Sequence, residues 1–419
     1  MYKSPRGTSD ILPDDQIYWR ILNKNIEKIS SEFGYGRIDT PIIEDAKLFV
    51  RGIGKLTDIV EKETYTFKDR GDNLLTLRPE GTAPICRAYL QHGMQNSTQP
   101  IRLFYMLPNF RYERPQSGRY RQHHQFGAEN IGESDPNIDC EIIEYAWRFL
   151  KNVGLSKLNL EINSIGDKQC RPKYITTLKE YYNSYTNDLC EDCIRRLENN
   201  TLRLLDCKKT ECKKIISKAP NNLDYLCDEC KQHWELLLLY LSDIKLPYII
   251  NRRLVRGFDY YTRTVFEITP KTIGSTTAIA GGGRYDGLIE ELGGPETPGI
   301  GFGIGMERVI LELKNQSIPI PKNNNNKILI ANLGLKSKHT AISIASFLRK
   351  NGITTILGPS SKNLRRQLKY ASSIGSTHVI IIGDDEIQKN KLIIKNLSSG
   401  TQDSIPNKPN DLVKMLSNN

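Results

Sequence analysis

The chain contains a series of short segments with strand-like composition, and few of them are separated by a long helical pattern. These segments lie near residues 74–78, 102–113, 122–131, 158–165, 263–269, 276–281 and 299–305. A parallel pair of strands needs a long crossover connection, usually a helix, whereas antiparallel neighbours do not. The pattern therefore predicts an α+β fold built on a largely antiparallel sheet with a few helices, rather than a doubly wound fold.

Two common nucleotide-binding loops do not occur in this sequence. There is no GxxxxGK[ST] segment, and no GxGxxG segment opens a helix after a strand. Both loops bind phosphate through backbone N–H groups at the start of a helix. The sequence therefore argues against the ATP-binding folds that depend on those loops.

A helix is expected near the N-terminus, over residues 14–33. Apolar residues recur there at spacings of three and four, at Tyr18, Leu22, Ile26, Ile29 and Phe33. Asp14 can cap the start of this helix, and Gly34 stands where a left-handed residue would end it. The segment Arg37–Pro41 that follows resembles a strand closed by proline.

The middle of the chain differs from the segments on either side of it. From about 168 to 250 the sequence is helical, charged and rich in cysteine, and strand-like composition resumes after it. An insertion into the sheet explains this break.

The low-complexity run 315–326 is typical of a linker. Beyond it, strands at 328–333, 354–357 and 378–382 alternate with helices, which predicts a small parallel α/β domain.

Three segments carry side chains suited to binding an anion. Phe110–Glu113 continues an apolar run, so Arg111 and Glu113 are expected on one face of a strand. Leu254–Tyr261 sets Arg256 beside two hydroxylated rings and an aspartate. Gly301–Arg308 alternates glycine along a strand and then places Arg308 in a helix; the bare face lets a flat base approach the backbone. Arginine in a fixed position offers phosphate a bidentate fork.

Together and in this order, the three segments resemble the histidyl-tRNA synthetase family of class II aminoacyl-tRNA synthetases. The resemblance implies a class II catalytic domain with an antiparallel sheet and a helical insertion, followed by a C-terminal α/β anticodon-binding domain. It also implies the expected boundaries: a catalytic domain in two parts at 1–167 and 251–314, the insertion at 168–250, the linker at 315–326 and the anticodon-binding domain at 327–419.

The resemblance implies a histidine–tRNA ligase. Such an enzyme joins L-histidine to ATP as histidyl-adenylate, releases pyrophosphate and transfers histidine to the 3′-terminal adenosine of tRNA(His). ATP and Mg²⁺ are the implied cofactors. The first helix and the strand ended by Pro41 would form the contact of a homodimer. Both reaction partners are anionic, so positioning and charge neutralisation should dominate catalysis.

The resemblance also assigns residues to ATP. Arg111 and Arg256 would approach the α-phosphate from opposite sides, with Arg256 standing in for a metal ion, and Arg308 would reach the γ-phosphate. These three are the implied catalytic residues. The other implied ATP-binding residues are Glu113, Arg119, Gly303 and Gly305.

Histidine binding is assigned in the same way. Glu129 and Tyr261 match positions that hold the imidazole, with Tyr285 near them, and Glu80, Thr82 and Gln125 match positions around the amino and carboxylate groups. The full implied set is Glu80, Gly81, Thr82, Gln125, Glu129, Arg256, Tyr260, Tyr261 and Tyr285. Independently of the resemblance, Glu80 can also cap a helix that begins near Gly81, and both roles can hold.

Contacts to RNA are expected in two places. Arg114, Gln116 and Arg121 lie in a basic loop whose counterpart in the family meets the tRNA acceptor end. The C-terminal domain carries basic residues at Lys338, Arg349, Lys350, Arg365, Arg366 and Lys369. The chain has 59 lysines and arginines against 48 acidic residues, a formal net charge of +11, which favours a polyanionic partner.

Six of the nine cysteines lie between Cys190 and Cys230. The pairs Cys190/Cys193 and Cys227/Cys230 have the spacing of structural zinc ligands, with two more cysteines between them. Zinc could hold together an insertion too small to fold on its own core. Zinc is not a general cofactor of the family, so the sequence leaves both bound zinc and reduced thiols open.

Other functions explain the sequence less well than the ligase does. A non-catalytic paralogue that binds histidine and regulates a phosphoribosyltransferase would usually lack key arginines and the C-terminal domain, which are present here. A generic RNA-binding protein would leave the arginines unexplained.

His123 and His124, as strand neighbours, point to opposite faces and cannot act as a pair. No apolar stretch approaches the roughly 20 residues of a membrane span, and we expect a soluble cytoplasmic protein.

Overall fold

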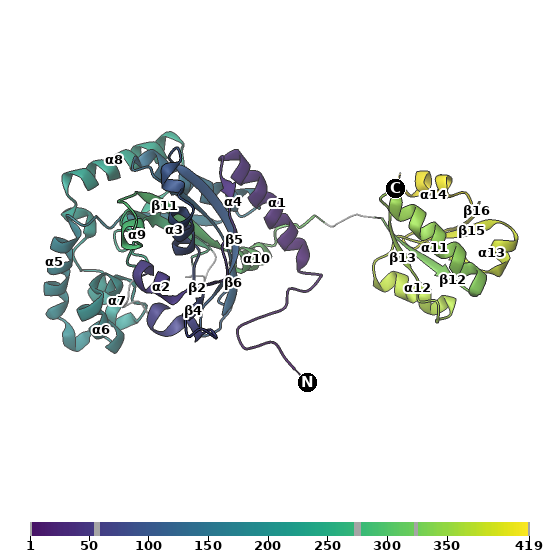
Figure 1. Cartoon of the computed structure of the whole chain (residues 1–419), viewed down its shortest axis with the longest axis horizontal. Helices are drawn as coiled ribbons and strands as arrows, with labels where there is room; N and C mark the ends of the chain where they lie inside the picture. Colours follow the sequence, from purple (N-terminus) through teal and green to yellow (C-terminus); the bar gives the residue numbers. More distant parts are fainter. Residues whose placement is uncertain (1, 54–58, 272–277, 322–325, 418–419) are drawn as a thin grey trace. The chain divides into compact units, whose positions relative to one another are not determined.

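The computed structural model describes residues 2–53, 59–271, 278–321 and 326–417. The chain forms two compact units, Met1–Ile320 and Pro321–Asn419 (Figure 1). Within the described residues, none of the helices combines the length and the apolar character that crossing a bilayer requires.

The first unit is built on an eight-stranded sheet with the order β1-β5-β6-β11-β10-β9-β7-β8. Its strands are β1 (Gly36–Arg37), β5 (Ile101–Phe110), β6 (Gln122–Ile131), β7 (Leu158–Ser164), β8 (Ile249–Ile250), β9 (Thr262–Pro270), β10 (Ala280–Arg284) and β11 (Gly299–Gly305). Only the two outermost pairs, β1/β5 and β7/β8, are parallel. The predicted antiparallel sheet is confirmed.

The strand ends agree with the sequence prediction at β6 and β11 but not at β5. The prediction of one strand through residue 113 is wrong, because β5 ends at Phe110 and Arg111 and Glu113 lie beyond it. The N–H of Tyr112 donates to the carbonyl of Glu63 at 2.7 Å instead of continuing the ladder with β6. The expected strand at 276–281 begins only at Ala280, with residues 276–277 outside the described part of the chain.

Helices cover one face of this sheet and enclose the main apolar core. They are α1 (Gln16–Glu32), α4 (Pro136–Asn152), α8 (Asp228–Asp243) and α10 (Met306–Asn315). Phe126 of β6 lies at the centre of this core, with its ring 4.8 Å from that of Phe149 and 5.4 Å from that of Phe302. Because side chains alternate along a strand, Gln125 and Glu129 point to the opposite face.

The first helix is shorter than predicted. It begins at Gln16, and Asp15 rather than Asp14 occupies the N-cap without a capping side-chain hydrogen bond. A turn over Leu12–Asp15 precedes the helix, and Leu12 O accepts the backbone N–H groups of Asp15 and Gln16. The predicted left-handed stop is confirmed, since Gly34 has φ of +73°.

A small second sheet and three short helices complete the first unit. The sheet has the order β2-β4-β3, with β2 (Ile43–Asp45), β3 (Tyr65–Lys68) and β4 (Leu74–Leu77). Beside it lie α2 (Ala46–Ile53), the π-helical turn Ile59–Glu63, α3 (Thr82–Gln91), the 3₁₀ turn Met94–Asn96 and α9 (Leu288–Glu291). Of these strands, only β4 was expected from the sequence.

The segment between β7 and β8 is helical, as predicted for the insertion, and Figure 1 shows it in teal. Its helices are α5 (Arg171–Asn183), α6 (Glu191–Asn199), α7 (Thr210–Ile216) and α8, with 3₁₀ turns at Thr186–Asp188, Thr201–Asp206 and Asn222–Tyr225. The apolar side chains of α5, α6 and α7 share one buried cluster with Tyr260, Tyr261 and Tyr285, whereas those of α8 belong to the main core. Most of the insertion therefore shares its core with these three tyrosines.

The second unit has a five-stranded sheet with the order β13-β12-β14-β15-β16. Its elements are β12 (Lys327–Asn332), α11 (Leu335–Lys350), β13 (Thr354–Leu357), α12 (Leu364–Ser373), β14 (His378–Ile382), α13 (Asp384–Gln388), β15 (Lys391–Asn396), β16 (Gln402–Pro406) and α14 (Pro409–Ser417). The first three strands are parallel as predicted. β15 and β16 add antiparallel pairs, because their short connections cannot form a crossover. Part of the predicted linker, 322–325, lies outside the described residues.

Candidate active site

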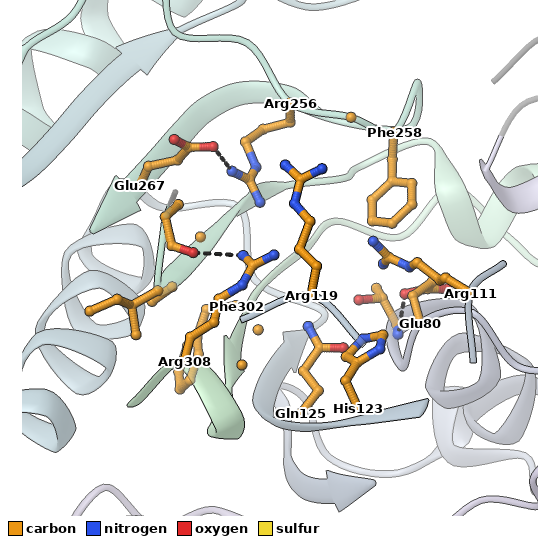
Figure 2. Close-up of a pocket in the computed structure, with 18 of the residues that line it drawn as sticks. Glu80, Arg111, Arg119, His123, Gln125, Arg256, Phe258, Glu267, Phe302 and Arg308 are labelled. Atoms are coloured by element: carbon orange, nitrogen blue, oxygen red, sulfur yellow. Dashed lines mark hydrogen bonds and ion pairs between the residues drawn. The ribbon is translucent and has the colours of Figure 1, made fainter. Parts of the chain in front are cut away.

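Three arginines from distant parts of the chain line one cavity of about 330 Å³ on the sheet face opposite the main core. Arg111 follows β5, Arg256 precedes β9 and Arg308 lies in the first turn of α10. Figure 2 shows their guanidinium groups around the same space, together with that of Arg119. The sequence predicted a common cavity for these three side chains, and the structure brings them together.

Arg111 is fixed by the backbone of a neighbouring segment. Its Nε donates to the carbonyl of Pro79 at 2.8 Å, and its guanidinium lies 5.6 Å from the ring centre of Phe258. The nearest carboxylate, that of Glu113, is 3.8 Å away. A guanidinium has five N–H donors, so this one keeps donors for the oxygens of a ligand.

Arg256 is anchored by an ion pair with Glu267 of β9. The side chain also needs a bare backbone beside it: a Cβ added to Gly281 would come within 2.5 Å of the guanidinium. The glycine run of β10 therefore makes room for Arg256. Glu267 and Phe258 were not predicted from the sequence; β9 carries three threonines and Arg263 besides Glu267, so this glutamate does not stand out.

Arg308 is held by two neutral carbonyls. Its Nε donates to Gly118 at 2.9 Å and its Nη1 to Ala278 at 2.7 Å. Burial, together with the nearby charge of Arg119, lowers the pKa of Arg308 to about 10. A cation at this position is stabilised by an anionic ligand, because such a ligand offsets both the burial and the repulsion.

The two histidines behave differently. His123 lines the cavity, and burial, followed by the charges of Arg111 and Arg308, lowers its pKa to about 3, so it is neutral. The Nδ1 of His124 lies 2.8 Å from a carboxylate oxygen of Glu307, and its ring packs edge-on against Trp19 at 4.8 Å. The prediction that they cannot act as a pair is consistent with these separate surroundings.

Glu129 is completely buried behind the cavity wall, in contact with the wall residues Thr82 and Tyr285, and accepts three hydrogen bonds. Its donors are Thr82 Oγ1 at 2.8 Å, Tyr105 OH at 3.1 Å and Tyr285 OH at 2.8 Å. Burial raises the pKa of Glu129 to about 8. Tyr105 was missed from the sequence, where it looked like one apolar residue in the Leu103–Leu107 run.

The alternating glycines of β11 make room for polar side chains of β6. A Cβ at Gly301 would lie 1.7 Å from a carboxylate oxygen of Glu129, and one at Gly303 would lie 1.6 Å from Nε2 of Gln125. At Gly305 the added atom would make only an ordinary 3.4 Å contact with Arg308. Two of the glycines of β11 are therefore needed because Glu129 and Gln125 occupy the space beside them, which the pattern of glycines alone did not reveal.

Glu80 caps α3 and also lines the cavity. Its carboxylate accepts the N–H groups of Thr82 at 2.6 Å and Ala83 at 2.8 Å, which confirms the predicted helix cap. Gly81 lies behind the wall, where a Cβ would meet the ring of Tyr105 at 2.5 Å. The cavity wall also contains Thr82, Glu113, Arg119, Gln125, Tyr260, Tyr261, Tyr285, Gly303 and Gly305.

Other predicted residues lie away from the wall. Arg114 and Gln116 are exposed in the loop after β5, and Arg121 stacks on the ring of Tyr112 at 3.7 Å. In contrast, Asp206 and Lys208 of the insertion do line the cavity. They could not be singled out from the sequence, because two charged residues in a charged helical segment look like ordinary solvated surface.

The two cysteine pairs with zinc-ligand spacing, Cys190/Cys193 and Cys227/Cys230, do not lie together. The first pair lies with Cys207 and Cys212, and the second pair lies with Asp167 and Cys170. The reason is the path of the chain, because α6 and the turn after it fold back within the insertion. Sequence spacing alone could not reveal which pairs meet.

An antiparallel sheet that brings three separated arginines to one polar cavity, with a second α/β unit after it, defines a class II aminoacyl-tRNA synthetase. The chain belongs to the histidyl-tRNA synthetase family. Residues 7–309 match the family model described as histidyl-tRNA synthetase, and residues 320–419 match the one described as an anticodon binding domain.

Individual relatives agree with this assignment. The chain is 52% identical over 406 residues to a protein of Dehalococcoides mccartyi named histidine–tRNA ligase, covering 97% of both chains. It is 45% identical to a protein of the same name from Desulforamulus reducens, covering 96% of both. The crystal structure of apo S. aureus histidyl-tRNA synthetase matches with a TM-score of 0.82 and 37% identity, over 99% of this chain and 100% of that one.

Proposed function

We propose that this protein is a histidine–tRNA ligase that activates L-histidine with ATP and then esterifies tRNA(His). The observation that carries the proposal is the convergence of Arg111, Arg256 and Arg308 on one cavity, whose wall residue Tyr285 donates to the buried carboxylate of Glu129. Three cations suit a triphosphate, and a buried carboxylate suits the N–H of an imidazole.

In the first step, a carboxylate oxygen of histidine attacks the α-phosphate of ATP. A new O–P bond forms, the bond to the β-phosphate oxygen breaks, and pyrophosphate leaves with its electron pair. Arg111 and Arg256 would neutralise the charge that gathers on the α-phosphate, and Arg308 would bind the γ-phosphate. In the second step, a hydroxyl of the terminal adenosine of the tRNA attacks the acyl carbon and AMP leaves.

Magnesium is expected to accompany ATP. The ion prefers oxygen ligands and is usually held by one or two carboxylates together with substrate phosphates. Glu113 fits this role, since its contacts with Arg111 and Arg119 are long, at 3.8 and 3.7 Å. The ion would add positive charge beside the phosphates.

Glu129 is proposed to select histidine. Its oxygens would accept the N–H of the ring, while the hydroxyls of Tyr261 and Tyr285 complete the surroundings. A wrong amino acid would leave these buried polar groups unpaired, and such sites discriminate by about 10⁴-fold or more. Gln125, Glu80 and Thr82 would bind the amino and carboxylate groups.

The remaining partners are proposed from the family. Arg114, Gln116 and Arg121 would contact the acceptor end of the tRNA, and the second unit would contact the anticodon. The segments α1 and β1 would form the interface of a homodimer, and the protein would work in the cytoplasm.

Amino-acid-dependent exchange of pyrophosphate into ATP tests the proposal. We expect exchange with histidine and at least about 10³-fold less with each other standard amino acid, in the absence of tRNA. Equal exchange with several amino acids, or none with histidine by a protein that binds ATP, would refute the proposal.

A further inference from the structure

The insertion and the residues next to it contain two groups of side chains with the composition of metal sites. The first cysteine cluster consists of Cys190, Cys193, Cys207 and Cys212. The second cysteine cluster consists of Asp167, Cys170, Cys227 and Cys230. Within each cluster the ligand atoms all lie within 4.8 Å of one another. We propose that each cluster binds one zinc ion and that the two ions hold the insertion against the active site.

The spacing of the sulfur atoms fits a metal ion better than a disulfide. The Sγ atoms of Cys190 and Cys207 are 3.9 Å apart. Four sulfurs at about 2.3 Å from a central zinc, arranged as a tetrahedron, lie roughly 3.8 Å from one another. A disulfide would need about 2.05 Å. All nine cysteines lie in the described part of the chain, and all are free thiols.

The surroundings of the first cysteine cluster also fit thiolate ligands. All four side chains are buried, and the N–H of Cys190 points to the sulfur of Cys212 at 3.5 Å. Hydrogen bonds of this kind orient metal-bound ligands and stabilise their charge. Without a metal ion these buried thiols stay protonated; a bound divalent cation would offset the repulsion among the four thiolates that form when it binds.

The second cysteine cluster has a carboxylate already oriented by its neighbours. Oδ1 of Asp167 accepts the N–H of Gln169 at 3.0 Å and lies 3.5 Å from the sulfur of Cys170. Oδ2 faces the guanidinium of Arg263 at 3.3 Å. One oxygen is thus directed to the cluster while the other is fixed by an arginine, which is the outer-shell support expected around a zinc ligand.

Both clusters are coupled to the segment that contains Arg256 and Tyr261. The chain between Cys193 and Cys207 carries Arg203, whose Nη1 donates to the carbonyl of Gly257 at 2.7 Å. Beside the second cluster, Nη2 of Arg171 donates to the carbonyl of Tyr261 at 2.6 Å. Fixing the two clusters therefore fixes the backbone on which the phosphate- and histidine-directed side chains are carried.

The metal content of the full-length protein, purified without chelators from zinc-supplemented cells, tests the proposal. We expect two zinc ions per chain. Cys193→Ser should remove one of them and Cys230→Ser the other, while the double variant should bind none. Cys140→Ala is the matched control, since this buried thiol of α4 belongs to neither cluster, and it should keep both ions.

Cobalt substitution of the wild-type protein gives a second measurement that needs no variant. Exchange with Co²⁺ should produce intense sulfur-to-metal absorption and the visible bands of a tetrahedral ion, with saturation at two equivalents. A folded protein that held no stoichiometric zinc and took up no cobalt would overturn the proposal. Ions retained by both cysteine variants would overturn the assigned ligands.

These measurements are independent of the proposed ligase activity, because metal content is read without histidine, ATP or tRNA. A protein with two zinc ions and no exchange would retain the metal sites and lose the ligase assignment. Histidine-dependent exchange by a protein that binds no metal would support the ligase assignment and refute the metal sites.

Discussion

Glu129 is the side chain whose chemistry depends most on its surroundings. It is fully buried, and its three hydroxyl donors do not prevent burial from raising its pKa to about 8. In the free protein at neutral pH the carboxyl group is therefore largely protonated. A bound imidazole can change this balance, because a ring N–H or a positively charged ring favours the carboxylate.

The raised pKa predicts how stability depends on pH. The unfolded chain releases this proton near the ordinary pKa of 4.5 and the folded protein releases it near 8. Ionisation of Glu129 therefore does not lower the free energy of unfolding below pH 4.5, and it lowers that free energy by its full amount above pH 8. Relative to Glu129→Gln, the wild type should lose up to about 1.4 kcal/mol of unfolding free energy per pH unit in this window.

Denaturant unfolding of both proteins, followed across this pH window, measures the difference. Glu235→Gln, at an exposed glutamate of α8, is the matched control and should run parallel to the wild type. If the unfolding free energies of Glu129→Gln and the wild type changed in parallel with pH, Glu129 of the folded protein would not hold this proton.

Arg256→Ala should separate catalysis from folding. The substitution removes one donor that is proposed to bind the α-phosphate, and loss of such a donor typically lowers kcat by about 10² to 10³. Its ion pair with Glu267 is partly exposed, and pairs of this kind contribute at most about 1 kcal/mol to stability. Single-turnover formation of histidyl-adenylate and the thermal midpoint measure the two effects.

The control for this variant is Arg252→Ala, an exposed arginine of the same segment that pairs with Asp224 at 3.5 Å. It should form the adenylate at the wild-type rate. Undiminished activity of Arg256→Ala would remove this residue from the proposed catalytic set.

Strand β10 ends at Arg284, which forms an ion pair between the large sheet and helix α4. Arg284 is fully buried and pairs with Asp139 of α4, which is buried as well. Arg284 also donates to the carbonyl of Glu133 at 2.9 Å. The segment 280–284 thus combines space for Arg256 with a structural anchor.

Breaking this anchor should be costly. Arg284→Met leaves the carboxylate of Asp139 buried without its main partner, and removal of one member of a buried pair typically costs about 3–5 kcal/mol. The double variant Arg284→Met, Asp139→Leu should recover much of that loss. Arg148→Ala, which breaks an exposed pair with Glu144, should cost less than about 1 kcal/mol.

Chemical denaturation of the wild type and these three variants measures the values. An Arg284→Met protein as stable as Arg148→Ala would contradict the anchoring role of the pair.

The sequence predicted elements well where one physical pattern acted alone. Strands β6, β11, β13 and β14 have the expected ends, because their apolar alternation or buried runs are bounded by clear breaks. The prediction failed where tertiary partners decide the outcome. The N–H of Tyr112 donates to the carbonyl of Glu63 and not to β6. In the small sheet, β2 and β3 both pair with β4, which lies between them, so each depends on a tertiary partner.

The same limit applies to the site. The three arginines were found because their segments are distinctive. No local pattern in the sequence predicts that Glu267 and Asp206 line the cavity or that Tyr105 donates to Glu129. The cysteine pairs show the limit again, since the path of the chain, and not their spacing, decides their neighbours.

For the whole molecule, the second unit should add tRNA affinity without changing the chemistry at the first. Arg365, Arg366 and Lys369 are exposed on α12. Changing all three to alanine should weaken tRNA binding and flatten the slope of log affinity against log salt, by up to about 0.9 for each phosphate that is no longer neutralised. Histidine-dependent exchange without tRNA should stay at the wild-type rate.

Filter binding or fluorescence titration over a range of salt concentrations measures the slope. An unchanged slope would place the tRNA contacts of this unit elsewhere than on α12.

Three separated guanidinium groups should bind one triphosphate beside a pocket for imidazole. A crystal structure of the protein with histidine and a non-hydrolysable ATP analogue would show whether they do. We predict the α-phosphate between Arg111 and Arg256, the γ-phosphate at Arg308 and the imidazole at the carboxylate of Glu129. A nucleotide bound away from these arginines, or a histidine ring out of reach of Glu129, would refute the proposed site.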